Sequence, residues 1–231
     1  KAKSNRVPIR EQLQQAADQL SKEKPKQKER ANESRREMEA VNVKLLKQSE
    51  TDQMTGLANR YRLNAYSEKV LDYCYEHRLP LAMEILDIDF FKQYNDNYGH
   101  QQGDECIIAI ANELKKMEDG QTFCARYGGD EFIIIYAGIS AEEVHAKAGA
   151  LRQNIMNLKL EHLYSKALPI VTISQGISYG VPEEGNRSWD FLHTADMLLY
   201  QVKKRSRNDI CIADIRGQEL DLSSKQEKVE P

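Results

Sequence analysis

The chain has 231 residues, of which 40% are hydrophobic and 30% charged, and its formal net charge is −3. This length fits one medium-sized domain with an appendage better than two full domains, and the apolar fraction is sufficient for a folded core. The near-neutral charge gives no support for binding to nucleic acid or to an acidic membrane, so we expect no nucleic-acid partner. The four scattered cysteines contain no C-x-x-C pair, which indicates reduced core thiols in the cytoplasm and gives no support for a zinc site.

Residues 1–50 differ in composition from the rest of the chain. They are rich in Lys, Glu, Gln and Arg and contain no Gly, Phe, Tyr or Trp. Apolar residues recur at helical spacing on either side of Pro25, at Ile9, Leu13, Ala16 and Leu20 and then at Met38, Val41 and Leu45. Because this apolar stripe is too thin to fold alone, we predict a helical, coiled-coil signalling arm that pairs with a second copy. The alternative is a solvated polar helix or a disordered linker.

From residue 51 the composition becomes globular, and we predict one domain over residues 51–215 and a polar flexible tail over residues 216–231. The patterns predict these elements in order: a helix over 60–76, a buried strand over 81–89, a turn-rich stretch over 90–105 and a helix over 106–117. They continue with strands over 122–127 and 131–136, a helix over 140–160, a strand over 169–180, a helix over 188–205 and a last strand over 209–214. This alternation predicts an α/β domain in which helices flank a split, ferredoxin-like sheet.

Four acids lie at the ends of two predicted strands. Asp87 and Asp89 end the first core strand, and Asp130 and Glu131 follow Gly128-Gly129, a strong hairpin signal, at the start of another. In a β-α-β-β layout these strands are neighbours, so acids from both can face one point. Gathered carboxylates repel one another, and a hard divalent cation such as Mg²⁺ compensates them. Taken alone, the two acids of the hairpin are equally well explained as residues that solubilise a turn.

Other polar residues suit phosphate and a purine base. The segment 89–92 leads into a turn whose amides could bind phosphate. Lys203 and Arg207, four residues apart on one predicted helix face, suit phosphate oxygens, although cations at a helix C-terminus commonly serve the helix dipole. Asn95 and Asp104 could read a purine edge, where a carboxylate favours guanine. By themselves Asn95 is more typical of a turn former and Asp104 of a first-turn helix acid than of residues that contact a base.

Five segments together resemble one family, the GGDEF domain of bacterial diguanylate cyclases, in family order over residues 52–212. They are DQMTGLANR, DIDFFKQYNDNYGHQQGDE, RYGGDEF, VTISQGIS and ADMLLYQVKKRSRN. The resemblance implies a palm-like α/β fold similar to that of nucleotidyl cyclases and polymerases. It also implies condensation of two GTP into cyclic di-GMP and two pyrophosphates, with Mg²⁺ or Mn²⁺ as cofactor, two ions per active site. The alternative is a catalytically silent domain that binds GTP or cyclic di-GMP and acts as a signalling scaffold.

The resemblance also implies a role for individual residues. Asp87 and Asp130 are the implied metal-binding carboxylates, the Ile88 carbonyl adds a backbone oxygen, and Glu131 is expected to assist the metal or the 3′-hydroxyl chemistry. The implied guanine-reading pair is Asn95 and Asp104. The implied phosphate contacts are Phe90, Phe91, Lys92, Lys203 and Arg207.

One departure from the family concerns product inhibition. Many members carry an Arg-x-x-Asp motif before the signature glycines, and here Asp119 and Thr122 replace its Arg and its Asp. We therefore expect no primary product-inhibition site.

The resemblance also bears on assembly and location. One GGDEF domain holds one GTP, so two domains must meet, and we expect a homodimer formed through the arm. The chain begins at Lys1 without a Met or an apolar leader, so we expect a fragment that lacks an upstream sensor or membrane segment. The expected location is the cytoplasm, either free or as the cytoplasmic part of a membrane-anchored sensor protein.

Overall fold

The computed structural model describes residues 50–220 and, before them, residues 32, 35, 36, 38, 39, 41 and 45. The chain divides into two compact units, Lys1–Gln48 and Ser49–Pro231, and each is described by itself. All described residues of the first unit are helical, and the predicted stripe positions Met38, Val41 and Leu45 are exposed. The remainder of the predicted arm lies outside the described residues. Within the described part of the chain, no helix combines the length and the apolar character that a bilayer span requires.

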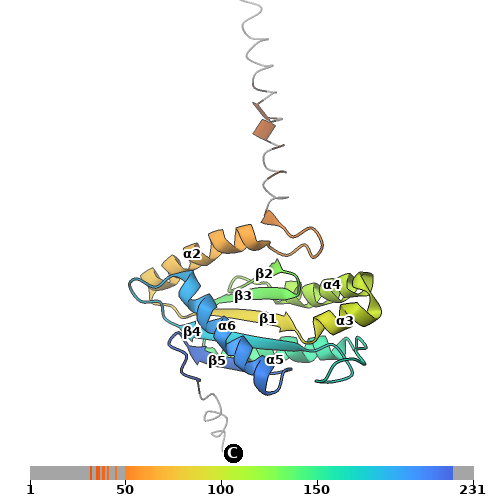
Figure 1. The fold of residues 1–231 in the computed structure, drawn as a ribbon. Coiled ribbons are helices and arrows are strands. Elements are labelled where there is room, and N and C mark those ends of the chain that lie inside the picture. The colour runs from red at the N-terminus through yellow and green to blue at the C-terminus, as the bar shows by residue number, and fades with distance from the viewer. Residues whose placement is uncertain are drawn as a thin grey trace, which may run out of the picture. The chain divides into compact units, whose positions relative to one another are not determined.

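The second unit is built on a mixed five-stranded sheet in the order β2-β3-β1-β4-β5 (Figure 1). The central strand β1 (Leu81–Ile88) is antiparallel to β3 (Glu131–Ala137) and to β4 (Ile173–Gly180). The strand β2 (Thr122–Gly128) extends the sheet beyond β3, and β5 (Ile210–Asp214) lies parallel to β4 at the other edge. The first four strands have the ferredoxin-like order, so the predicted fold class is confirmed, with β5 as an additional edge strand.

Helices cover both faces of this sheet. On one face α4 (His100–Met117) and α5 (Ala141–Asn157) share a core with Phe132, Ile134 and Tyr136 of β3. On the other face α2 (Arg60–His77) and α6 (Ser188–Arg205) enclose the alternate β3 residues Ile133 and Ile135. Successive side chains of a strand point to opposite faces, so β3 contributes to both cores. Figure 1 shows α6 crossing in front of the sheet, with α5 behind it.

Two local predictions were wrong. Residues 90–105 form no turn-rich stretch; they contain α3 (Phe91–Tyr98) and the start of α4. Gly99 separates the two helices because its φ of 86° is a left-handed conformation that favours glycine. The second wrong prediction is the position of the hairpin turn at Gly128-Gly129. The strand β2 continues through Gly128, so the turn consists of Gly129 and Asp130. Asp130 therefore lies in the turn itself.

The chain leaves the domain after β5. Residues 216–220, the start of the predicted polar tail, turn back along this strand, and the Leu220 amide donates a hydrogen bond to the Ile212 carbonyl (3.1 Å). Residues 221–231 lie outside the described residues.

A glutamate lies inside the core on the α4 and α5 side of the sheet. Glu84 of β1 is fully buried and accepts hydrogen bonds from the Tyr136 hydroxyl (2.8 Å) and from Nε2 of Gln175 (2.7 Å). Burial raises the pKa of Glu84 from 4.5 to about 7, although both hydrogen bonds favour the charged form. The carboxyl group is therefore largely neutral in the folded protein below that pH.

This burial makes stability depend on pH in a defined direction. The unfolded chain binds fewer protons at this position between pH 4.5 and about 7, so the stabilisation by the neutral carboxyl is complete below pH 4.5 and is lost as the pH rises to about 7. Glu84→Gln is neutral throughout. We expect its free energy of unfolding, relative to wild type, to rise by about 3 kcal/mol between pH 4.5 and pH 8, as measured by urea denaturation. The exposed Glu76→Gln is the control, and a pH-independent difference for Glu84→Gln would contradict the neutral carboxyl.

Candidate active site

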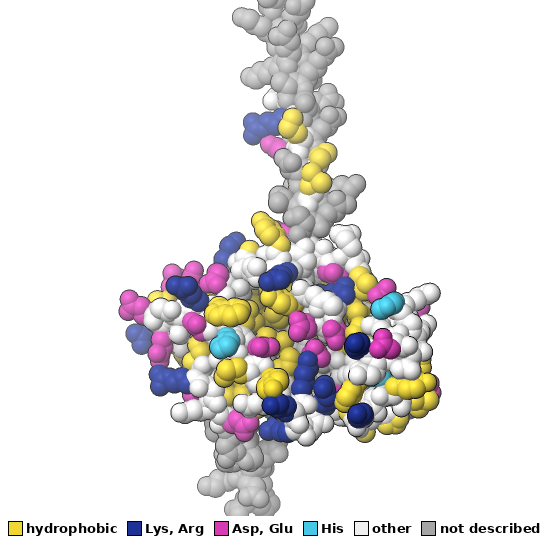
Figure 2. Space-filling view, in the orientation of Figure 1, with side chains coloured by type: hydrophobic (Ala, Val, Ile, Leu, Met, Phe, Trp, Pro, Cys, Tyr) yellow, Lys and Arg dark blue, Asp and Glu magenta, His cyan; other side chains and the backbone are white. Residues whose placement is uncertain are grey.

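Acidic side chains from two neighbouring strands meet at one edge of the sheet. Asp87, near the end of β1, lies directly opposite Glu131, the first residue of β3. Opposite residues of an antiparallel pair project from the same face, and here it is the face covered by α6. Asp130 precedes Glu131 in the turn. Figure 2 shows acidic and basic side chains side by side near the end of β1.

One lysine of α6 offsets part of the negative charge of this cluster. The Lys203 Nζ lies 2.7 Å from Oδ2 of Asp87, whose residue is only 8% exposed. Burial raises the pKa of Asp87 to about 6, Lys203 opposes this rise, and the negative charges of Asp130 and Glu131 add to it. Burial also raises the pKa of Glu131, to which Asp130 and Asp196 contribute as negative neighbours. The site thus holds more negative charge than a single ammonium group neutralises.

Asp89, which the sequence places with these acids, faces elsewhere. It is fully buried, and its carboxylate accepts hydrogen bonds from the Thr172 hydroxyl (2.8 Å), the Ser174 hydroxyl (2.6 Å) and the Asn208 amide (2.9 Å). The expectation that Asp89 faces the same point as the other acids is therefore wrong, because the start of β4, the residue before it and the loop after α6 supply its partners. Asp89 fixes the loop that follows β1.

That loop leads into α3, and three of the predicted phosphate contacts, residues 90–92, lie at this junction. Phe90 has a left-handed backbone with a φ of 56°, and its ring lies under the Arg207 guanidinium, 4.3 Å from the ring centre. The side chain of Phe91 packs in the core and Lys92 is exposed. The first amides of a helix have no partner within the helix, so the backbone of this loop offers donors to an anion.

The two predicted basic residues reach the site by different routes. Lys203 lies in α6, but the helix ends at Arg205, and Arg207 follows with a left-handed φ of 54°. The prediction that both lie on one helix face is wrong. Their side chains still converge on the end of β1, because Lys203 contacts Asp87 and the Arg207 Nη1 lies 3.6 Å from Oδ1 of Asp89.

The predicted base-reading residues lie on adjacent helices. Asn95 is in α3, and its Oδ1 is buried without a hydrogen-bond partner among the residues that the structure describes. An unpaired buried acceptor of this kind calls for an explanation, such as a ligand or water that completes it. A Cβ at Gly103, in the first turn of α4, would lie 1.8 Å from this oxygen. Asp104 follows Gly103 and is exposed.

Comparison with known proteins shows the family of this chain. The family described as "Diguanylate cyclase, GGDEF domain" matches residues 49–209. The chain is 35% identical over 163 residues to the probable diguanylate cyclase DgcC of Escherichia coli K12, which covers 69% of this chain and 42% of that protein. It is 33% identical over 189 residues to diguanylate cyclase DgcP of Pseudomonas aeruginosa, covering 80% of this chain and 27% of that protein. The chain belongs to the GGDEF family of diguanylate cyclases.

Solved structures support the family assignment. The coiled coil and GGDEF domain of DgcB from Caulobacter crescentus, in complex with c-di-GMP, superposes with a TM-score of 0.71 at 28% identity. The superposition covers 80% of this chain and 97% of that one. The present chain spans less than half the length of the two curated relatives above.

The turn that carries the signature of this GGDEF domain is held by an arginine that sequence reasoning missed. The Arg126 guanidinium donates to the Gly129 carbonyl (2.8 Å) through Nη2 and to Oδ1 of Asp52 (3.2 Å) through Nη1. Asp52 lies in the loop before α2. The proximity of Arg126 to the glycines in RYGGDEF was a usable signal, whereas its contact with Asp52 joins segments far apart in the sequence.

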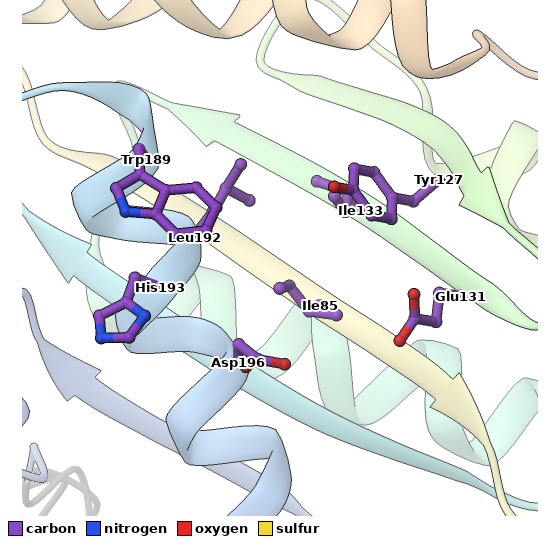
Figure 3. A pocket seen from close by; sticks show the side chains of 8 residues that line it. All are labelled: Ile85, Tyr127, Glu131, Ile133, Trp189, Leu192, His193 and Asp196. Atoms are coloured by element: carbon purple, nitrogen blue, oxygen red, sulfur yellow. The ribbon is translucent and has the colours of Figure 1, made fainter.

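Sequence reasoning also missed a further acid of the GGDEF domain, Asp196. It lines a pocket of about 220 Å³ between β1, β3 and α6, together with Ile85, Tyr127, Glu131, Ile133, Trp189, Leu192 and His193 (Figure 3). The Asp196 and Glu131 side chains lie across the pocket from each other. Asp196 and Lys203 are seven residues apart on α6, so helical spacing places them on one face and would have indicated this position.

The carboxylates fit a divalent cation by their chemistry. Within residues 50–220 and the other described positions, no three His, Cys, Asp or Glu residues form a preassembled metal cluster. The groups that could ligate a metal at this edge of the sheet are nevertheless all oxygens, namely the carboxylates of Asp87 and Asp130 and the carbonyl of Ile88. Hard divalent cations prefer oxygen ligands. Burial is the main cause that raises the pKa of Asp87, and repulsion by Asp130 and Glu131 adds to it. A cation would relieve this repulsion, and Lys203 supplies one positive charge at that place.

Residues 119–122, which replace the family's product-inhibition motif, are bound by a lysine of α5. The Lys147 Nζ, from α5, lies 2.8 Å from Oδ2 of Asp119 and 3.0 Å from the Thr122 hydroxyl. Lys147 is the main cause that lowers the pKa of Asp119 to about 2. Lys147 and Asp119 thus form an ion pair at the position of the family motif.

Proposed function

We propose that this GGDEF domain is an active diguanylate cyclase that condenses two GTP into cyclic di-GMP and two pyrophosphates. The observation that supports it best is the pairing of Asp87 with Glu131 beside Asp130, opposite Lys203 and next to the amide end of α3. Carboxylates, an ammonium group and the first backbone amides of a helix thereby share one edge of the sheet. The chain retains both signature acids, which a catalytically silent domain has no need to keep.

The residues that would hold Mg²⁺ or Mn²⁺ are Asp87, Asp130 and the carbonyl of Ile88, with Glu131 beside them. The bound cation supplies charge that polarises the α-phosphate and lowers the pKa of the attacking 3′-hydroxyl. If Asp87 held such a cation, Lys203 would no longer be needed as its partner and its ammonium group would be available to a phosphate oxygen. Until nucleotide arrives, Lys203 would therefore offset part of the negative charge of the carboxylates.

The nucleotide is oriented by the two helices after β1. The backbone of Phe90, Phe91 and Lys92 would bind the β- and γ-phosphates, with Arg207 at their far end. Asn95 and Asp104 would bind the guanine edge. The unpaired Oδ1 of Asn95 supports this role, because it is an acceptor for which a donor of the base would be a partner. The remaining task is alignment, since a second GTP must present its 3′-hydroxyl from another domain.

That second domain is supplied in our proposal by a homodimer formed through the N-terminal arm. A solved relative contains a coiled coil together with its GGDEF domain. The described residues of the arm are helical, and three of its predicted stripe positions, Met38, Val41 and Leu45, are exposed. Pairing through the arm would raise the local concentration of the second domain.

The test is product analysis. The full chain is incubated with Mg²⁺ and GTP, or with ATP, and the products are separated by chromatography. We expect cyclic di-GMP from GTP and no cyclic product from ATP. Bound but unconverted GTP would support the scaffold alternative, and absence of both binding and product would refute the proposal.

The packing of the Asn95 side chain against Gly103 gives a specific prediction. Gly103→Ala places a methyl group where the Asn95 amide lies, so we expect the KM for GTP to rise about tenfold or more through misplacement of the guanine-reading side chain. Alanine is the better helix former by about 1 kcal/mol, so lost helix stability does not explain such a result. The matched control is Gly120→Ala, because a Cβ there meets nothing within 4 Å. Equal KM values for the two variants would contradict the assignment of Asn95.

The Asp119–Lys147 pair leads to a prediction on feedback. With neither the arginine nor the aspartate of the family motif, we expect micromolar cyclic di-GMP to leave the initial rate unchanged. The measurement is pyrophosphate release with and without added product. Submicromolar inhibition that persists after removal of residues 1–48 would contradict it.

A further inference from the structure

The hairpin between α5 and β4, residues 160–171, is fastened to α3. The Val171 amide donates to the Leu160 carbonyl (2.8 Å) and closes the hairpin. The Leu163 amide donates to the Tyr98 hydroxyl of α3 (3.0 Å). Segments far apart in the sequence therefore lie side by side at the rim of the proposed nucleotide site, next to α3 in Figure 1.

This hairpin brings a buried histidine to the loop after β1. The ring of His162 is fully buried, and its Nε2 lies 3.1 Å from the carbonyl oxygen of Phe90. A carbonyl can only accept, so Nε2 carries the ring hydrogen. The Nδ1 atom is buried without a partner within the described part of the chain. A charged ring would leave a second N–H there without an acceptor, which favours the neutral ring. Tyr94 fixes the ring edge-on, with centroids 5.2 Å apart.

Phe90 needs such support. Its φ of 56° is a left-handed conformation that is uncommon and costly for a residue with a bulky side chain. Its carbonyl accepts two hydrogen bonds, from the Tyr94 amide (3.0 Å) and from His162, and its ring is covered by Arg207. The Tyr94 bond is the first bond of α3 itself, whereas the His162 bond ties the turn to a separate element.

We propose that His162 is a positioning residue for the triphosphate. Its Nε2–H holds the Phe90 carbonyl, and with it the turn that aims the amides of Phe91 and Lys92 at the β- and γ-phosphates. This inference rests on the proposed function, because GTP is the ligand in question. The effect on binding is selective for the phosphates, because the side chain of Asn95, which is proposed to bind guanine, packs against Gly103 of α4. Loss of the His162 bond therefore weakens binding of the polyphosphate far more than binding of the base.

The test compares two nucleotides by isothermal titration calorimetry with Mg²⁺ and the full chain. One is the α,β-methylene analogue of GTP, which cannot be converted, and the other is GMP, which lacks the β- and γ-phosphates. His162→Phe keeps a flat ring without the N–H. We expect its affinity for the analogue to fall about tenfold, the size of a lost hydrogen bond, and its affinity for GMP to stay within about twofold.

Three further variants separate the loss of this hydrogen bond from general damage to the domain. In His162→Gln the side-chain amide reaches the position of Nε2, so we expect the preference for the triphosphate to be retained, whereas the shorter His162→Asn is expected to lose it. Tyr98→Phe removes the other side-chain hydrogen bond between α3 and the hairpin. We expect this control to leave the ratio of the two affinities unchanged.

Each outcome decides between support and rejection. Equal losses for both nucleotides in His162→Phe would show a merely structural role and overturn the proposal. If thermal unfolding shows that this variant does not fold, the Gln and Asn variants decide, and equal ratios for them overturn it. A wild-type chain that binds neither nucleotide removes the proposed function and this inference with it. A wild-type chain that binds both, with unchanged ratios in the variants, removes the inference alone.

Discussion

Replacing Asp130 with alanine is expected to reduce cyclic di-GMP formation by about 10³-fold, while the domain stays folded. The residue lies in the Gly129–Asp130 turn, where it supports neither core. Its carboxylate is one of the two proposed for the divalent cation, and losing one electrostatic contact in an active site commonly costs about 10²–10³-fold in rate. The measurement is initial rate at saturating GTP, with thermal unfolding of the same sample.

Asp130 gives a cleaner test than Asp87. Removing Asp87 leaves Lys203 without its partner at 2.7 Å in a largely buried place, which by itself destabilises the domain. The matched control is Asp72→Ala, an exposed acid on α2 that is expected to keep full activity. Product formation by Asp130→Ala at the wild-type rate would refute the proposed metal ligands.

Removing residues 1–48 is expected to make the rate per molecule rise in proportion to protein concentration. Product formation needs two nucleotide-bearing domains in our proposal, and tethering through the arm replaces a bimolecular encounter by an intramolecular one. Tethering of this kind raises the apparent affinity between two domains by about 10²–10⁴-fold. We therefore expect the specific activity of the truncated chain at nanomolar protein to fall by a factor of that order. The measurement is specific activity of the truncated chain over a wide range of concentrations.

An unrelated dimeric coiled coil in place of residues 1–48 is the control, and it is expected to restore activity at low concentration. This outcome would separate a role in pairing from a specific contact made by the arm. A truncated chain whose rate per molecule does not change with concentration would contradict the two-domain mechanism.

The sequence by itself was enough to derive the architecture. Hydrophobic periodicity located the strands, and the β-α-β-β-α-β order predicted the sheet, because both depend on local spacing and on short connections. The two glycines before Asp130 indicated a hairpin, and its acids indicated a charge cluster with Asp87. The register of β1 and β3 then placed Asp87 opposite Glu131. Local reasoning was wrong over residues 90–105, where polar composition concealed two helices.

The tertiary structure decided which partner each of these side chains meets. Asp87 and Asp89 are two residues apart on β1, yet one faces Lys203 and the other is buried under Thr172 and Ser174. The dependence of Asn95 on Gly103 and the bond from His162 to Phe90 arise from packing between separate elements. Local patterns carry information on spacing along the chain, whereas such contacts depend on how helices and strands distant in sequence come together around one core.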